Sequence, residues 1–449
     1  MQSKFCYILY TLLIVLTIYT DSPLQGVLES FGESLLPTFS IVLTCILYPM
    51  GMLRNRNRFI NSFGILIVYT LVVSVAALIL FALAGNLTVR GEFLPVKTIK
   101  VMLYFVGYLS YILLLYNLSL ELSISEILSP FLWTFLLLTI ILLVEIQQIP
   151  NAFAFLHYDF QPYWRVRLFA KESSWTASII QVYFSVSLYY TLYVKKSLNL
   201  SLLVIFSVVL HIVFSGSKTL LASLFLFVLF AIPLFLKGKS RLRKIVTISV
   251  GMILFGLLML LVLPKLSASA TNDLEEYTST VTRTYTMLCG YGIGVIFPLG
   301  TGFPSYIEIL PYVMKNNTWV VDSFFPNGNL NEVLSLAYGS TGKALSAKSF
   351  MGQSTIYWGI MGSLYLLWLL YKCYKDAQKN FRKEGFWLLK CTFLIMIIEL
   401  LFTSQMSYDF LAFIAAFLSI SHKRKGTRST IIAFATRRFL INSKRLITI

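Results

Sequence analysis

Long apolar runs recur along this chain, and they constrain its fold more than any other feature. A helix needs about 20 apolar residues to cross the roughly 30 Å of bilayer hydrocarbon. Twelve runs approach that length between charged residues, proline or glycine: 5–20, 35–53, 59–84, 98–116, 128–145, 174–194, 199–214, 219–236, 245–264, 356–371, 386–403 and 407–421. The sequence therefore predicts an all-α polytopic membrane protein with about 12 transmembrane helices.

The composition supports a bilayer rather than a soluble setting. The 449 residues are 57% hydrophobic and 12% charged, with a mean hydropathy of +0.77. Soluble domains carry about 25% charged residues. We predict a single integral membrane domain over residues 1–421, followed by a basic cytoplasmic tail over 422–449.

The net charge of +18 follows the predicted topology. With the N-terminus placed in the cytoplasm and Lys390 set aside because it lies inside a predicted span, 24 Lys and Arg residues fall on the inner face and 12 on the outer face. Cytoplasmic loops of membrane proteins carry such an excess. Both termini are therefore predicted to be cytoplasmic. Nucleic acid is not an expected partner, whereas membrane lipids are expected to contact the basic residues.

Two larger polar segments fall on the predicted outer face, at about 146–174 and 265–355. Irregular backbone cannot face hydrocarbon, because each unpaired N–H or C=O costs several kcal/mol there. The longer segment must therefore form a cap outside the membrane or line a wet cavity.

Arginines in these segments suggest binding of phosphate. Arg165 and Arg167 lie in the first segment and Arg283 in the second, while Lys218 interrupts apolar sequence near the same face. A guanidinium grips phosphate oxygens in pairs and stays charged in a low-dielectric site, which suits a lipid diphosphate. Alternatively, these side chains snorkel or pair with acids such as Glu172, and Lys218 marks a simple hairpin turn.

No metal site or cofactor is expected. The five cysteines are scattered, and none shows the spacing of ligands or of a disulfide framework.

Four segments together carry a resemblance to a known family. They are residues 165–177 (RVRLFAKESSWTA), residues 215–219 (SGSKT), Arg283 with residues 297–303 (FPLGTGF), and residues 354–362 (STIYWGIMG). In order and spacing they resemble the O-antigen polymerase and ligase superfamily, whose polymerases are called Wzy. Two departures stand out: Leu168 or Phe169 replaces the glycine usual after the first arginine, and residues 349–354 lack the histidine that ligases carry.

The resemblance implies a membrane glycosyltransferase of GT-C-like architecture in the bacterial plasma (inner) membrane. Such an enzyme joins undecaprenyl-diphosphate-linked oligosaccharide repeats on the outer face into O-antigen or capsule polysaccharide, without a metal. It implies diphosphate binding by Arg165, Arg167, Lys218 and Arg283, and a chain-length regulator as a further partner.

A base is expected to assist the attacking hydroxyl. Glu172 is our first choice because it lies beside Arg167 in the best-matched segment, although a salt bridge is the competing interpretation. The other carboxylates on the predicted outer face remain candidates for the base: Asp159, Asp273, Glu275, Glu276, Glu308, Asp322 and Glu332.

Ionisable residues in or beside the predicted spans raise a different possibility. Glu145, His211, Glu399 and Asp409 could mark a proton or ion pathway. We interpret His211 as a packing residue and place Glu145 and Asp409 near the membrane interface. The glycines at 290, 292 and 294 lack a preceding strand, so they predict helix packing or a turn rather than a nucleotide loop.

Two alternative functions remain. A flippase for lipid-linked oligosaccharides would need related halves and short loops, whereas this chain has no obvious repeat and one dominant outer segment. A ligase would differ from a polymerase only in its acceptor.

Overall fold

The protein is a helical membrane protein. Its computed structural model describes residues 2–28, 32–55, 57–159, 162–173, 175–215, 217–236, 256, 278–319, 323, 331–339, 345–380, 385–402 and 406–423. Within these ranges, five helices are long and apolar enough to cross a membrane: α4 (Arg58–Leu83), α5 (Leu94–Leu120), α6 (Ile124–Gln148), Thr176–Val194 and α8 (Leu198–Ser215). The fourth of these combines α7 (Thr176–Tyr189) with a π-helical turn, η4 (Tyr190–Val194).

Most of the other predicted spans coincide with further helices. These are α1 (Gln2–Val15) with η1 (Leu16–Ile18), α3 (Leu36–Leu47), α9 (Lys218–Leu236), α15 (Phe350–Asn380), α16 (Phe386–Phe402) and a last helix at 408–423. The predicted span 245–264 lies outside the described residues, apart from residue 256. The total of 12 spans therefore stays a prediction.

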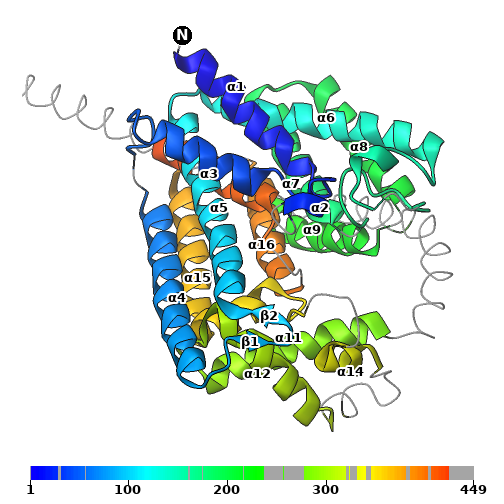
Figure 1. The fold of residues 1–449 in the computed structure, drawn as a ribbon. Coiled ribbons are helices and arrows are strands. Elements are labelled where there is room, and N and C mark those ends of the chain that lie inside the picture. Colours follow the sequence, from blue (N-terminus) through cyan, green and yellow to red (C-terminus); the bar gives the residue numbers. More distant parts are fainter. Residues whose placement is uncertain are drawn as a thin grey trace, which may run out of the picture.

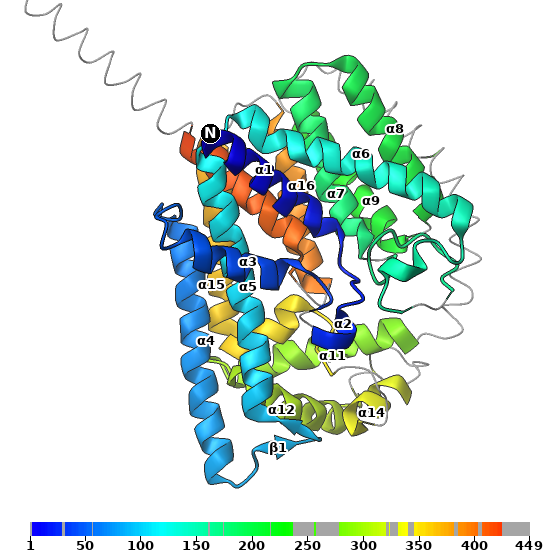
Figure 2. The same cartoon turned by 45° about the horizontal axis from the view of Figure 1, so that its top comes forward.

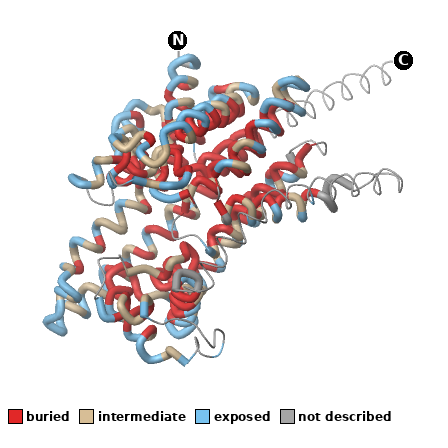
Figure 3. Tube along the Cα trace, turned by 90° about the vertical axis from the view of Figure 1, so that its right-hand side faces the viewer, coloured by how far each residue is buried: buried red, intermediate tan, exposed pale blue. Residues whose placement is uncertain are grey.

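Burial separates the central from the peripheral helices. In its most apolar window, the α7 span is 83% buried, whereas α4 is only 22% buried. α7 packs against α6, α8, α9 and α16, while α4 and α5 run side by side at the edge (Figures 1 and 2). Buried residues accordingly follow the contacts between helices, with exposed residues outside them (Figure 3). An exposed apolar helix such as α4 is suited to face lipid.

The described part of the long polar segment is helical. It holds α11 (Thr278–Ile296), α12 (Gly302–Asn316) and α14 (Asn331–Tyr338). α12 packs against α4, α5 and α14, at the end of α4 and α5 farthest from the N-terminus (Figure 1). The sequence predicted an outer loop here because the apolar residues of these helices are spread along one face rather than joined in a run.

A small hairpin ties this helical cap to the membrane helices. β1 (Thr88–Val89) and β2 (Glu92–Phe93) pair antiparallel between α4 and α5. At their turn, the Arg90 guanidinium donates hydrogen bonds to the carbonyl oxygens of Leu336 and Ala337, at 2.8 and 2.9 Å. These carbonyls end α14, where a cation is electrostatically favoured.

Two of the segments that carry the family resemblance meet at a kink in α15. Gly359 interrupts that helix with φ +72°, and Gly300 in the facing turn has φ +85°. The Thr301 N–H donates to the Ile356 carbonyl oxygen at 2.9 Å, and Met361 N–H donates to that of Pro298 at 3.3 Å. The backbone of the Pro298 to Thr301 turn lies so close to the kink of α15 that only glycine fits at position 359.

Gly359→Ala is therefore expected to destabilise the fold. The added Cβ would lie 2.0 Å from the Pro298 carbonyl oxygen, and the left-handed backbone alone costs about 1–3 kcal/mol for other residues. Gly292→Ala is the matched control, because a Cβ there meets nothing within 4 Å. Thermal unfolding in detergent should show a lower midpoint for Gly359→Ala only. Equal midpoints would contradict this account of the kink.

Candidate functional site

A cavity of about 640 Å³ lies among the predicted outer halves of the membrane helices. Its wall includes residues from α3, α5, α7, α9, α11 and α16 and from the start of the helix at 408–423. The topology predicted from sequence places all of these ends on one face. The cavity is therefore where the predicted outer segments and the membrane helices meet.

The cavity is amphipathic. Its apolar wall comes from membrane helices, including Ile179, Leu226, Ile395, Leu400 and Phe402. Its cations, Arg283 of α11 and Lys348 just before α15, come from the long polar segment. The Arg283 side chain is exposed and has no ion-pair partner among the described residues. The cavity thus offers positive charge to an anionic head group and apolar surface to a chain.

Glu172 lies in the same cavity as Arg283. It lies near the end of the described stretch 162–173, shortly before α7, and its side chain is exposed. Glu172 and Arg283 are far apart in sequence, and the sequence predicts both as site residues. The fold brings these two together.

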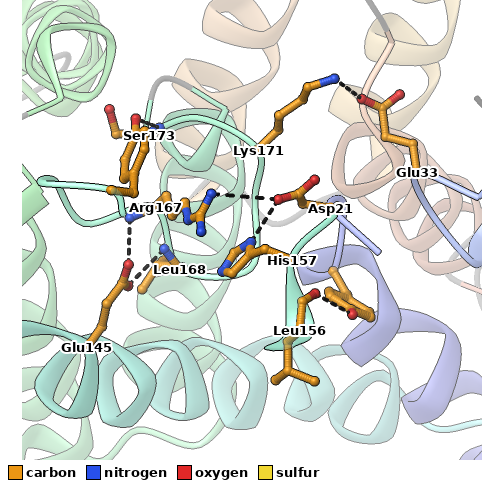
Figure 4. A network of polar contacts seen from close by, with 11 residues as sticks. Asp21, Glu33, Glu145, Leu156, His157, Arg167, Leu168, Lys171 and Ser173 are labelled. Carbon is orange, nitrogen blue, oxygen red and sulfur yellow. Dashed lines mark hydrogen bonds and ion pairs between the residues drawn. The ribbon is translucent and has the colours of Figure 1, made fainter. Parts of the chain in front are cut away.

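Arg167 lies elsewhere, in a buried cluster of charged residues (Figure 4). Its guanidinium nitrogen is 4.0 Å from Asp21 Oδ2, which is 2.8 Å from Nδ1 of His157. Its Cζ also lies 4.9 Å from the centre of the Tyr163 ring. Arg167, Asp21 and His157 are all buried, and none is among the described residues that line the cavity. This geometry favours a role for Arg167 in fixing the outer segment.

Glu145 holds the backbone beside this cluster. Each of its carboxylate oxygens accepts a backbone hydrogen bond at 2.8 Å, one from the N–H of Arg167 and the other from that of Leu168 (Figure 4). Leu168 has φ +52°, a conformation that favours glycine. Leu168 is one of the two residues that stand where the resembled sequences carry a glycine, and the buried carboxylate stabilises its left-handed backbone. The sequence placed Glu145 near the interface, whereas the structure gives it this buried role.

Arg167→Ala is expected to lower the thermal stability of the protein. Removing one member of a buried charged cluster leaves the others uncompensated, at a cost of about 3–5 kcal/mol. Arg165→Ala removes the same charge from an exposed position two residues earlier and should leave the unfolding midpoint unchanged. If both variants unfold at the wild-type temperature, the cluster does not stabilise the outer segment.

The remaining sequence predictions fall in different places. Arg165 is exposed and is not among the described lining residues. Lys218 begins α9, next to the lining residue Thr219, but its side chain lies outside the described part of the structure.

His211 is buried with Nε2 3.4 Å from the Thr139 hydroxyl, as expected of a packing residue. A Cβ on Gly290 or Gly294 would collide with α15, which confirms helix packing there, whereas one on Gly292 would meet nothing.

Two further acids line the cavity, Glu399 near the end of α16 and Asp409 in the first turn of the last helix. The sequence analysis considers both only for a proton or ion pathway and not as residues of the site. The available signal was their position inside apolar spans, where ionisable residues commonly mark a functional site. Within the described ranges, no group of three or more His, Cys, Asp or Glu residues could hold a metal ion.

Comparison with curated proteins finds a relative in Klebsiella pneumoniae. It is described as an "Uncharacterized 49.5 kDa protein in cps region" and is 26% identical over 194 residues. The match covers 42% of this chain and 43% of the relative, so the chain matches less than half of that protein's length. No protein-family model matches the chain. No solved structure matches it either.

Proposed function

We propose that this protein polymerises lipid-diphosphate-linked oligosaccharide repeats into a capsule-type surface polysaccharide. The supporting observation is the amphipathic cavity, in which Arg283 and Lys348 face the same space as apolar side chains of α7, α9 and α16. A lipid diphosphate has this combination of anionic head and apolar chain.

In the proposed reaction, a sugar hydroxyl of the acceptor attacks the anomeric carbon of the donor sugar. The bond from that carbon to the diphosphate oxygen breaks, and its electron pair leaves with undecaprenyl diphosphate. Arg283 and Lys348 would hold this leaving group through charged hydrogen bonds, each worth about 1.5–3 kcal/mol. Glu172, in the same cavity, is the base proposed from sequence.

The Klebsiella relative supports a polysaccharide context. Its description places it in a cps, or capsule, region. Together with the sequence resemblance to Wzy-type polymerases, this favours capsule polysaccharide as the product. The proposed partners are the undecaprenyl-diphosphate-linked donor and acceptor, membrane lipids and a chain-length regulator. The proposed location is the bacterial inner membrane, with both termini in the cytoplasm.

The experiment that tests this function is deletion of the gene in a strain that makes the polysaccharide. We expect loss of long polymer on a gel and accumulation of lipid-linked single repeats on the outer face. A flippase would instead leave those repeats on the inner face, and a ligase would leave long polymer attached to its lipid carrier. Unchanged polymer in the deletion strain would contradict all three.

A further inference from the structure

The charges of the cavity fall on different elements. Arg283 and Lys348 belong to the long polar segment. Two acids, Glu33 and Glu172, lie shortly before α3 and α7, whereas Glu399 and Asp409 belong to α16 and the last helix. A diphosphate is attracted by the cations and repelled by the carboxylates, more strongly in a site with little water. The part of the cavity that carries Glu399 and Asp409 is therefore suited to an uncharged group rather than to the anionic diphosphate.

Asp409 has a carboxylate oxygen that can accept a further hydrogen bond in this part of the cavity. Its side chain is 1% exposed and contributes to the cavity wall, and Oδ2 has no hydrogen-bond partner among the described residues. Buried polar atoms are nearly always paired in folded proteins, and an exception calls for an explanation. A donor from a bound molecule would supply the missing partner.

Two serine hydroxyl groups line the same cavity as Asp409. Ser178, in the first turn of α7, and Ser407, two residues before Asp409, also line the cavity. Each hydroxyl both donates and accepts hydrogen bonds, as the hydroxyls of a sugar do. A carboxylate flanked by such groups matches a neutral sugar that donates to it.

We infer that Asp409, Ser178 and Ser407 form the subsite for the acceptor sugar, and that Asp409 takes the proton of the attacking hydroxyl. This inference rests on the proposed function and assigns to Asp409 the role that sequence gave to Glu172. As the new glycosidic C–O bond forms, the O–H bond breaks and its proton moves to Asp409 Oδ2. The electron pair of the broken bond between the anomeric carbon and oxygen leaves with the lipid diphosphate, so no further reactant is needed.

The competing role for Asp409 is structural. It lies in the first turn of the helix at 408–423, where a negative charge is stabilised by the helix dipole. Asparagine serves well at helix N-termini but cannot accept a proton as a carboxylate does. Asp409→Asn therefore separates the two roles.

The test uses the full chain in lipid vesicles with a labelled lipid-diphosphate-linked repeat and a soluble acceptor glycan. For Asp409→Asn we expect a wild-type unfolding midpoint, unchanged binding of the donor, and a transfer rate about 10²- to 10⁴-fold lower. A carboxylate retained in Asp409→Glu should restore part of the rate. Transfer by Asp409→Asn at the wild-type rate would overturn the inference, as would loss of transfer in Glu172→Gln alone.

If Asp409→Asn does not fold, the Ser178→Ala and Ser407→Ala variants test the same subsite. Each should raise the KM for the acceptor and leave donor binding unchanged, and unchanged acceptor kinetics would overturn the inference. Failure of the proposed function is distinguishable, because then the wild-type protein itself does not lengthen the repeats.

Discussion

Replacing Arg283 with alanine is expected to lower the rate of polymer elongation by about 10²- to 10³-fold, the usual effect of losing one group that stabilises a developing negative charge. Arg283 lines the cavity and has no ion-pair partner among the described residues. Its removal therefore takes away binding of the leaving diphosphate without leaving a buried charge uncompensated. Folding should be retained.

The measurement is polymer length on a gel, in a deletion strain that carries the variant at the wild-type protein level. Lys315→Ala is the matched control, because Lys315 is an exposed cation of the same polar segment that stacks on Tyr338, 4.2 Å from the ring centre, outside the cavity. We expect accumulated single repeats for Arg283→Ala and normal polymer for Lys315→Ala. Long polymer from Arg283→Ala would remove this residue from the site.

Filling the cavity is expected to slow elongation as well. Ala222 of α9 lines the cavity and is exposed, so a tryptophan at that position has room to extend into it. Ala222→Trp should lower elongation at least about tenfold, because a loss of roughly 1.4 kcal/mol in binding already has that effect. The fold should be unaffected, since no packed core residue is replaced.

Leu229→Trp is the control for this variant. Leu229 lies on the same helix, is 51% exposed and is not among the described lining residues. Polymer length and the unfolding midpoint of both variants should be measured together. Normal polymer from a folded Ala222→Trp protein would show that the cavity is not the site of transfer.

Much of the fold could be predicted from the sequence, because long apolar runs have few alternatives to membrane helices. The pairing of Glu172 with Arg283 in one cavity could also be anticipated, since both lie on the predicted outer face. The burial of Arg167 could not, because its partners Asp21 and His157 come from distant parts of the chain. Hydropathy also does not tell which side of a helix faces a cavity, so the sequence predicts an interfacial position for Asp409 rather than one in the site.

The glycine contacts also could not be predicted from the sequence. The residues around Gly359 are part of the sequence resemblance, but the contact of its kink with the Pro298 to Gly302 turn is a property of the three-dimensional fold. Likewise, the helices α11, α12 and α14 carry their apolar residues on one face, and that pattern escapes a search for continuous apolar runs.

The central proposal is most directly tested with the purified full chain in lipid vesicles, supplied with labelled undecaprenyl-diphosphate-linked repeats. A polymerase predicts a ladder of lengthened products, with one undecaprenyl diphosphate released for each repeat added. Repeats that keep their original length, whether they stay in place or cross the membrane, would contradict it.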